Sequence, residues 1–138
     1  MKILLPVDGS ETSVRAVQFV IKQALNSKEM PELHLLNIQH SLPGTVKGVA
    51  DQAKQYHHDE GIKALANARK LLDDAKATYK YHIGVGEVGE VVAHFVKDLK
   101  CDQVVMGTRG MNAVANMVMG SGATKVLNLV DVPVLLVK

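Results

Sequence analysis

The chain has 138 residues, 47% of them hydrophobic and 22% charged, which is the balance of a globular protein and excludes a disordered or fibrous one. This length fits one domain with a substantial core, and we predict a single domain over residues 1–138. The 16 Lys and Arg residues nearly balance 14 Asp and Glu residues and form no run, which argues against a nucleic-acid partner.

Five short apolar runs alternate with longer segments of helical periodicity along the chain. The predicted strands are residues 2–7, 33–38, 79–85, 103–106 and 134–137. Ser10 is the predicted N-cap of the first helix. Such alternation is typical of a parallel sheet with helices on both faces, so we predict an open α/β fold. We assign its strands the doubly wound order 3-2-1-4-5.

Each predicted helix carries an apolar stripe at helical spacing, which marks the face that packs on the sheet. The stripes are Val14, Val17, Ile21, Ala24 and Leu25 in the first helix, Ile62, Leu65, Ala68, Leu72 and Ala75 in the second, Val88, Val91, Val92, Phe95, Val96 and Leu99 in the third, and Ala123, Val126, Leu127 and Val130 in the last.

The third and fifth strands are predicted at the two edges of the sheet. In the third, Tyr79, Tyr81, Ile83 and Val85 alternate with Lys80, His82 and Gly84, and this period of two indicates one face in water. The fifth strand, residues 134–137, is wholly apolar. Because an uncovered apolar edge is an aggregation hazard, we expect a second copy to cover it in a homodimer.

The two most unusual turn sequences follow the first and fourth strands. Strand one ends in Val7-Asp8-Gly9-Ser10, and strand four ends in Met106-Gly107-Thr108-Arg109-Gly110. In an open parallel sheet, ligands bind at the carboxyl ends of strands where the strand order reverses, which here is between strands one and four. The sequence therefore predicts a binding crevice between these two turns.

Glycines downstream of strand four indicate what this crevice binds. Gly107, Gly110 and Gly120-Ser121 give the spacing G-x2-G-x9-G-S, with Ser121 at the start of the last helix. Glycines let the backbone approach an anion, and a helix N-terminus favours a phosphate. The Arg109 guanidinium can neutralise phosphate charge, and Asp8 suits a ribose hydroxyl or a base.

Four segments that span the chain resemble the universal stress protein family, in its ATP-binding branch. They are Pro6-Val7-Asp8-Gly9-Ser10, Met106-Gly107-Thr108-Arg109-Gly110, Gly120-Ser121 and Pro133-Val134-Leu135-Leu136-Val137. The resemblance implies a Rossmann-like five-stranded sheet, dimerisation through the last strand, residues 134–137, and a bound ATP or other adenine nucleotide. If Mg²⁺ accompanies the nucleotide, we expect the phosphates to hold it.

The resemblance also implies the contacts of that nucleotide. Adenine lies near Asp8 and Ile38, and phosphate and ribose lie along Gly107, Arg109, Gly110, Gly120 and Ser121. We therefore predict the nucleotide site at Pro6, Val7, Asp8, Ile38, Met106, Gly107, Arg109, Gly110, Gly120, Ser121 and Gly122. One departure is Gly122-Ala123, where the family often has a bulkier or hydroxylated pair, and it removes a phosphate ligand.

A second glycine pattern competes with this site. Residues 84–89 have the spacing G-x-G-x-x-G between a strand and a helix, which matches the sequence pattern of the dinucleotide-binding fingerprint. Glu87 and Glu90 would face a pyrophosphate with negative charge, and the next strand ends at Met106-Gly107 without the ribose-binding acid. The alternative interpretation, a tight turn into a helix, is favoured.

Other chemistry-bearing residues form no recognisable motif. We predict that His57 and His58 lie on the surface, and that His34, His40, His82 and His94 have no metal-ligand spacing, so we assign no metal site. No catalytic residues are assigned, because Ser10 and Ser121 have no histidine partner and Asp8 has no second carboxylate. Cys101 is expected to be a buried thiol.

Three hypotheses of function follow. The first is a dimeric, ATP-binding module in the stress response, with at most slow hydrolysis, whose surface an unknown protein partner reads. The second is an ATPase or nucleotidyl transferase that uses Asp8 and Arg109. The third is a dimeric scaffold without nucleotide. No run is long enough for a membrane span or a signal segment, so we expect a cytoplasmic protein with no membrane partner.

Overall fold

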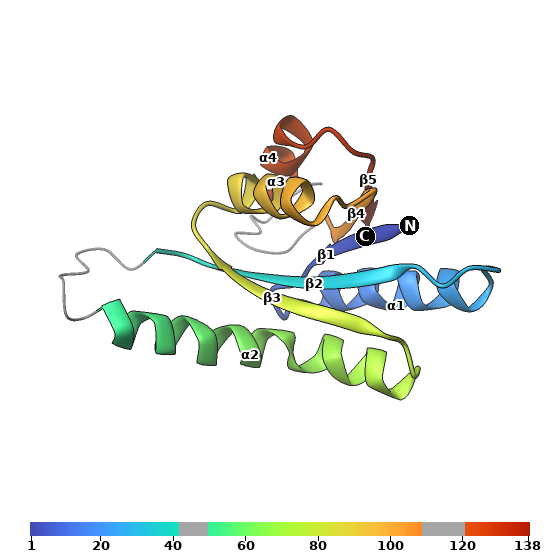
Figure 1. Ribbon diagram of the computed structural model, residues 1–138, viewed down its shortest axis with the longest axis horizontal. Coiled ribbons are helices and arrows are strands. Elements are labelled where there is room, and N and C mark those ends of the chain that lie inside the picture. Colours follow the sequence, from blue (N-terminus) through green and yellow to red (C-terminus); the bar gives the residue numbers. More distant parts are fainter. Residues whose placement is uncertain (42–49, 109–120) are drawn as a thin grey trace.

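A computed structural model gives the fold, and the structure describes residues 1–41, 50–108 and 121–138. Strands and helices alternate along the chain (Figure 1). They are β1 (Lys2–Pro6), α1 (Glu11–Leu25), β2 (Glu32–Gln39), α2 (Ala50–Asp74), β3 (Tyr79–Val85), α3 (Val88–Leu99), β4 (Gln103–Gly107), α4 (Ser121–Leu129) and β5 (Val134–Val137). The ends of the strands lie within one residue of the predicted ends.

The strands form one parallel sheet in the order β3-β2-β1-β4-β5, which confirms the predicted topology. Figure 1 shows α1 and α2 on one face of the sheet and α3 and α4 on the other. β3 and β5 are the edges, as predicted. Because β1 pairs with β2 on one side and β4 on the other, the strand order reverses between β1 and β4.

Each face of the sheet has its own apolar core, because a strand buried on both sides sends alternate residues to opposite faces. In β1, Leu5 joins the core beneath α1 and α2, whereas Leu4 joins the core beneath α3 and α4. The predicted stripes of α2 and α3 are confirmed, with Leu65 and Leu72 completely buried in the first core and Val92 completely buried in the second.

The prediction that a residue belongs to the core is wrong at two positions. Leu25 at the end of α1 is 69% exposed, because the buried stripe runs through Val17, Val20 and Ala24. The residue after Ala24 points about 100° further round the helix and away from the sheet. Leu127 of α4 is 42% exposed for the same reason, since its neighbour Val126 occupies the buried position.

The prediction of one wet face on β3 is also wrong in detail. Tyr81 and Val85 belong to the apolar set and are exposed, while His82 is half-buried and Gly84 is buried. Phe95 of α3 covers the polar face, since its ring lies 5.4 Å from the His82 ring and close to Gly84. An edge strand covered by one helix on each face is therefore partly shielded on both.

A close contact between β4 and α1 determines where the carboxyl end of the sheet meets the helix. A Cβ added at Gly107 would lie 2.8 Å from the backbone carbonyl carbon and Oγ1 of Thr12, in the first turn of α1. Real Cβ atoms do not approach backbone this closely, so only glycine fits without a shift of the helix. The last residue of β4 therefore touches α1 directly.

We expect Gly107→Ala to lower the free energy of unfolding by about 1–3 kcal/mol, because overpacking here must displace backbone. Urea denaturation followed by circular dichroism measures it. Gly122→Ala is the matched control, since its new Cβ would lie 3.4 Å from Val88 Cγ1, an ordinary contact. An equal loss in both variants would contradict the proposed close packing at Gly107.

Candidate functional site

A pocket opens at the carboxyl ends of β1, β2 and β4, at the point where the strand order reverses. The helices α1, α3 and α4 contribute the rest of its wall. Its lining residues are Pro6, Val7, Asp8, Ser13, Leu36, Ile38, Val88, Met106, Gly107, Gly122 and Ala123. This is the crevice that the turns after strands one and four predicted.

The fold brings together seven of the predicted nucleotide-site residues in this pocket. They are Pro6, Val7, Asp8, Ile38, Met106, Gly107 and Gly122. Arg109, Gly110 and Gly120 lie outside the described residues. Ser121 is the first residue of α4, and its side chain is not described. That any of them binds a nucleotide stays a prediction.

Sequence reasoning missed four lining residues, Ser13, Leu36, Val88 and Ala123. Leu36 could have been found, because it lies two residues before Ile38 and so faces the same side of β2. Val88 and Ala123 were predicted only as core residues of their helices. Their position at the pocket depends on how far α3 and α4 extend past the strands, which local sequence does not specify.

The turn after β1 holds Asp8 at the pocket. Oδ1 of Asp8 accepts a hydrogen bond from the backbone N–H of Ser10 at 2.9 Å, and Gly9 between them has φ +86°, a conformation that favours glycine. Ser10 then caps α1 by accepting from the N–H of Ser13, as predicted. Asn37 of β2 fixes the strand end, since its Nδ2 donates to the carbonyl of Val7 at 2.8 Å.

The pocket combines an apolar wall with one charge. Leu36, Ile38, Val88 and Met106 present hydrocarbon, and Asp8 is the only ionisable side chain among the described lining residues. Such a surface suits a planar apolar group whose polar edge meets one strong acceptor. It offers no second acid or base, so the described residues provide no acid–base pair for chemistry.

A second hollow continues from this pocket between the end of β2, α3 and α4. It shares Val88 and Gly122 with the first. Its remaining lining residues are His40, Ser41, Gly86, Glu87 and Lys125. Here Lys125 is exposed and pairs through Nζ with Oε1 of Glu87 at 3.3 Å.

Glu87 occupies the N-terminus of α3 with its own carboxylate. Oε1 accepts a hydrogen bond from the backbone N–H of Gly89, and Oε2 accepts one from the backbone N–H of Glu90. Both nitrogen-to-oxygen distances are 3.0 Å. These backbone hydrogen bonds, together with Lys125, lower the pKa of Glu87, so the carboxyl remains ionised. A phosphate at this helix end would meet a negative charge in its place. The geometry supports a capped turn into a helix for residues 84–89, and Gly86 at φ +143° makes that turn.

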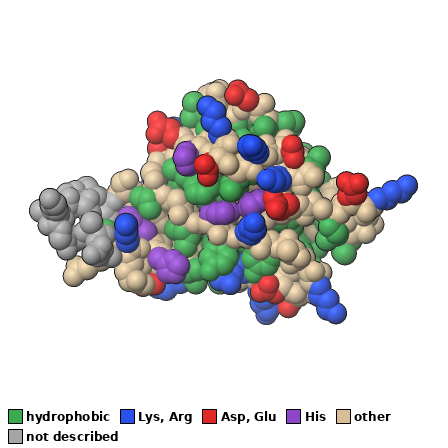
Figure 2. Space-filling view, viewed as in Figure 1, with side chains coloured by type: hydrophobic (Ala, Val, Ile, Leu, Met, Phe, Trp, Pro, Cys, Tyr) green, Lys and Arg blue, Asp and Glu red, His purple; other side chains and the backbone are tan. Residues whose placement is uncertain are grey.

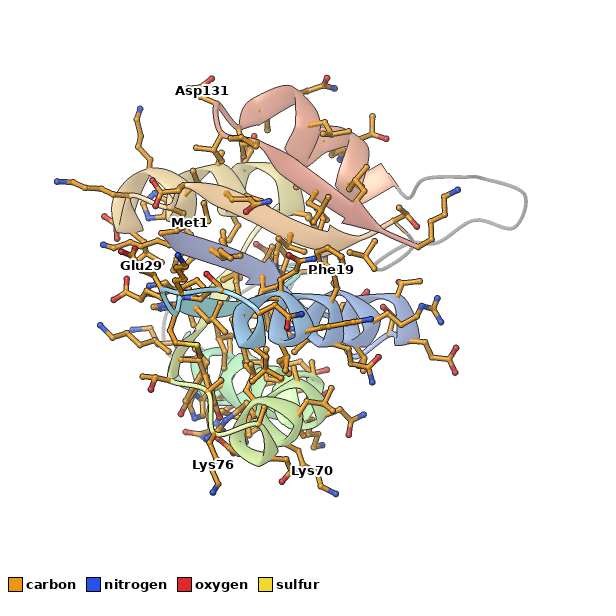
Figure 3. All side chains as sticks on the ribbon, turned by 90° about the vertical axis from the view of Figure 1, so that its right-hand side faces the viewer. Met1, Phe19, Glu29, Lys70, Lys76 and Asp131 are labelled. Carbon is orange, nitrogen blue, oxygen red and sulfur yellow. The ribbon has the colours of Figure 1, made fainter. Side chains whose placement is uncertain are left out.

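Another hollow lies at the amino end of the sheet, on the side of α1. Met1, Phe19 and Glu29, which are labelled in Figure 3, line it together with residues of β4 and β5. None of the predicted site residues lies there. The candidate site is therefore the pocket at the carboxyl end.

Two further expectations can be compared with the structure. Cys101 is buried, as predicted, and burial raises the pKa of its thiol. His57 was predicted on the surface and is buried, because it points from α2 toward the end of β2, where its Nε2 lies 3.0 Å from the carbonyl oxygen of His40. Within residues 1–41, 50–108 and 121–138, no group of three His, Cys, Asp or Glu side chains could hold a metal ion.

Comparison with known proteins decides the family. The model of the universal stress protein family matches residues 1–138. The chain belongs to the universal stress protein family. It is 25% identical to universal stress protein MJ0531 of Methanocaldococcus jannaschii over 138 residues, which cover 99% of this chain and 81% of that protein.

Solved structures of universal stress proteins share this fold. The structure of MJ0577, a universal stress protein of Methanocaldococcus jannaschii, has a TM-score of 0.82 and 28% identity, and the match covers 99% of this chain and 94% of that one. An Arabidopsis thaliana member solved with AMP bound has a TM-score of 0.70 and 19% identity, with coverage of 100% and 91%. An Archaeoglobus fulgidus member was solved with dAMP, at a TM-score of 0.64, 20% identity and coverage of 100% and 98%.

No helix within the described part of this universal stress protein is long and apolar enough to cross a membrane.

We expect Glu87→Ala to destabilise the protein by up to about 1 kcal/mol at pH 7, because it removes a helix cap. Since the folded state lowers the pKa of Glu87 below 4.5, its stabilising contribution is present above pH 4.5 and lost as the pH falls through the lower folded value. We therefore expect urea denaturation to give a smaller difference in the free energy of unfolding between Glu87→Ala and wild type near pH 3 than at pH 7.

Glu90→Ala is the control for this experiment, because Glu90 is exposed in the same helical turn and only its backbone N–H takes part in the cap. Equal losses for the two variants, or a Glu87→Ala effect that persists unchanged near pH 3, would contradict the capping role.

Proposed function

We propose that this protein binds ATP or a related adenine nucleotide in the pocket at the carboxyl ends of β1, β2 and β4. The observation that carries the proposal is the convergence in space of seven residues that the sequence predicted as one site. They come from four separate elements and the turn after β1, and they meet where ligands bind in open parallel sheets.

The lining chemistry indicates how a nucleotide would lie. The adenine ring would pack between the hydrocarbon of Ile38 and that of Met106, and Asp8 would accept a hydrogen bond from a ribose hydroxyl or from the base. Phosphates would extend toward the N-terminus of α4 at Ser121-Gly122, because the N-terminus of α3 is already occupied by Glu87.

Solved relatives support the choice of adenine. Family members have been solved with AMP, dAMP and cAMP, and these ligands share the base but differ in sugar and phosphate. The shared base would lie against the apolar wall that Ile38, Val88 and Met106 form. Mg²⁺ would be held through the phosphates, because Asp8 is the only carboxylate among the described lining residues.

The pocket favours a binding and regulatory module of the stress response over an enzyme. One carboxylate oxygen of Asp8 already accepts a hydrogen bond from the Ser10 N–H, and no second ionisable group is among the described lining residues. Hydrolysis of ATP would therefore be slow. Partner proteins would bind differently to the nucleotide-bound and the nucleotide-free forms.

Nucleotide binding is tested first by denaturing freshly purified protein and identifying released nucleotides by mass spectrometry, then by calorimetric titration with ATP. We expect binding in the wild type and a loss of at least about tenfold in affinity in Gly122→Leu, because the new side chain would extend beside Val88 into the pocket.

Asn128→Leu is the matched control, since it adds a leucine to the exposed face of the same helix. It should bind as the wild type does. No released nucleotide and no heat on titration of the wild type would overturn the proposal, and equal losses in both variants would show that Gly122→Leu acts through the helix and not the pocket.

We further propose a homodimer through β5. All four residues of this edge strand are apolar and only half-buried, although their neighbours in β4 are mostly buried. Hydrophobic side chains in an edge strand favour pairing with a second copy. Analytical ultracentrifugation at micromolar concentration should give twice the chain mass, and a monomer mass throughout would contradict this dimer.

A further inference from the structure

Two histidines from neighbouring strands meet end to end on the face of the sheet that α3 covers. Nδ1 of His34 in β2 lies 2.9 Å from Nε2 of His82 in β3. Their ring centres are 5.2 Å apart, with only 21° between the ring planes. With the nitrogens so close, the centres can be this far apart only if both nitrogens lie near the line that joins them. The rings are therefore nearly coplanar, with a straight nitrogen-to-nitrogen contact.

Glu32 extends this contact into a row of three side chains. Its Oε2 lies 3.0 Å from Nε2 of His34, so both nitrogens of the His34 ring have partners. The His34 side chain is only 3% exposed, while Glu32 and the half-buried His82 reach the surface. Figure 2 views the molecule from its β3 side and shows histidine side chains together near the middle, between α3 and α2.

The number of protons in this row is limited by its geometry. With both rings neutral, His82 donates to Nδ1 of His34, and His34 donates to Glu32. With one added proton the hydrogen bond between the rings is kept whichever ring carries the charge, because the other ring still has a bare nitrogen that accepts. With two added protons, N–H groups on both rings point at each other across 2.9 Å, and the hydrogen bond is lost.

The surroundings of the two rings also disfavour binding of a second proton. Burial, the charge of His34 and that of Lys80 lower the pKa of His82, in that order of importance. Among the described residues, Lys2 from β1 and Lys80 from β3 act electrostatically on the row, and the buried thiol of Cys101 lies near Glu32. On the side of α3, the Phe95 ring packs against both His82 and His94. Of the side chains that the structure describes, Glu32 is the only carboxylate hydrogen-bonded to either ring, and it contacts His34.

We propose that His34 and His82 form a proton-sensitive latch that holds β3 against β2 with at most one proton on the pair and releases it when both rings are charged. In the described part of the chain β3 is an edge strand, and no strand there pairs with its outer side to compensate for the loss. The inference does not depend on nucleotide binding, since neither ring lines the pocket, although His82 is the register partner of the pocket residue Leu36.

A metal ion does not fit between the two rings as they lie. Metal–nitrogen bonds of about 2.0–2.1 Å in a straight line would need nitrogens roughly twice that far apart. A hydrogen bond of 2.9 Å between coplanar rings is instead the length expected for one shared proton. The geometry therefore points to a proton as the ligand of this pair.

The first test is a titration of the wild-type imidazoles by ¹⁵N NMR between pH 8 and pH 4. We expect coupled titration in two steps, with the second proton binding below the ordinary histidine pKa, and loss of the His34–His82 hydrogen-bond signal at that step. Independent titration of both rings near their ordinary pKa would overturn the latch. A specific shift of both rings on adding Zn²⁺ at pH 7 would also overturn it, in favour of a metal site.

The second test measures how firmly β3 is paired with β2, from the hydrogen-exchange rates of the β3 backbone amides. These rates are corrected for the intrinsic pH dependence of exchange. Because the folded state disfavours a charged His82, this stabilisation is present above about pH 6.5 and lost as the pH falls. Between pH 7 and pH 5 we expect exchange in β3 to accelerate at least about tenfold more in wild type than in His82→Gln, whose amide still donates to His34 but does not titrate.

His58→Gln is the matched control, because His58 is exposed on α2 and its replacement should leave the wild-type acceleration intact. Equal acceleration in the wild type and His82→Gln would contradict the proposal. Should His82→Gln fail to fold, the NMR titration of the wild type decides the question alone.

Discussion

The contact of Gly107 with the first turn of α1 is the constraint on which the candidate site depends. Because Gly107 has no side chain, the carboxyl end of β4 lies directly against Thr12, and α1 begins beside β4 as well as β1. Asp8 lies in the turn between β1 and α1, so its position follows from the same contact. A larger residue at Gly107 would move the helix and change the pocket that α1 helps to line.

The two helix N-termini near the pocket have different roles. Glu87 satisfies the first amides of α3 and pairs with Lys125 of α4, which ties the two helices together beside the pocket. A helix that supplies its own anion offers little to a phosphate. The same helix-end physics that stabilises α3 thus directs a proposed nucleotide toward α4, and a glycine pattern that matches a dinucleotide fingerprint by letter serves as a capped turn.

The sheet joins the proposed nucleotide pocket to the proposed latch. Leu36 lines the pocket and lies on the same face of β2 as His34, two residues away. Phe95 packs on His82 and comes close to Gly84, so the rows of side chains under α3 are continuous from the histidine pair to the pocket end of β3. Loosening of β3 would remove one side of the support of β2, which offers a route by which acid could alter the pocket.

Hydrophobic periodicity in the sequence by itself determined which segments are strands and which are helices. The strand order and the predicted place of a ligand site came from the general rules of doubly wound parallel sheets. Only the tertiary structure decided which helix positions face outward, as at Leu25, and which helix residues reach the pocket, as at Val88. The meeting of His34 with His82 also needed the fold. Their separation of 48 residues carries no signal, and only the register of β2 with β3 brings the two rings into hydrogen-bond contact.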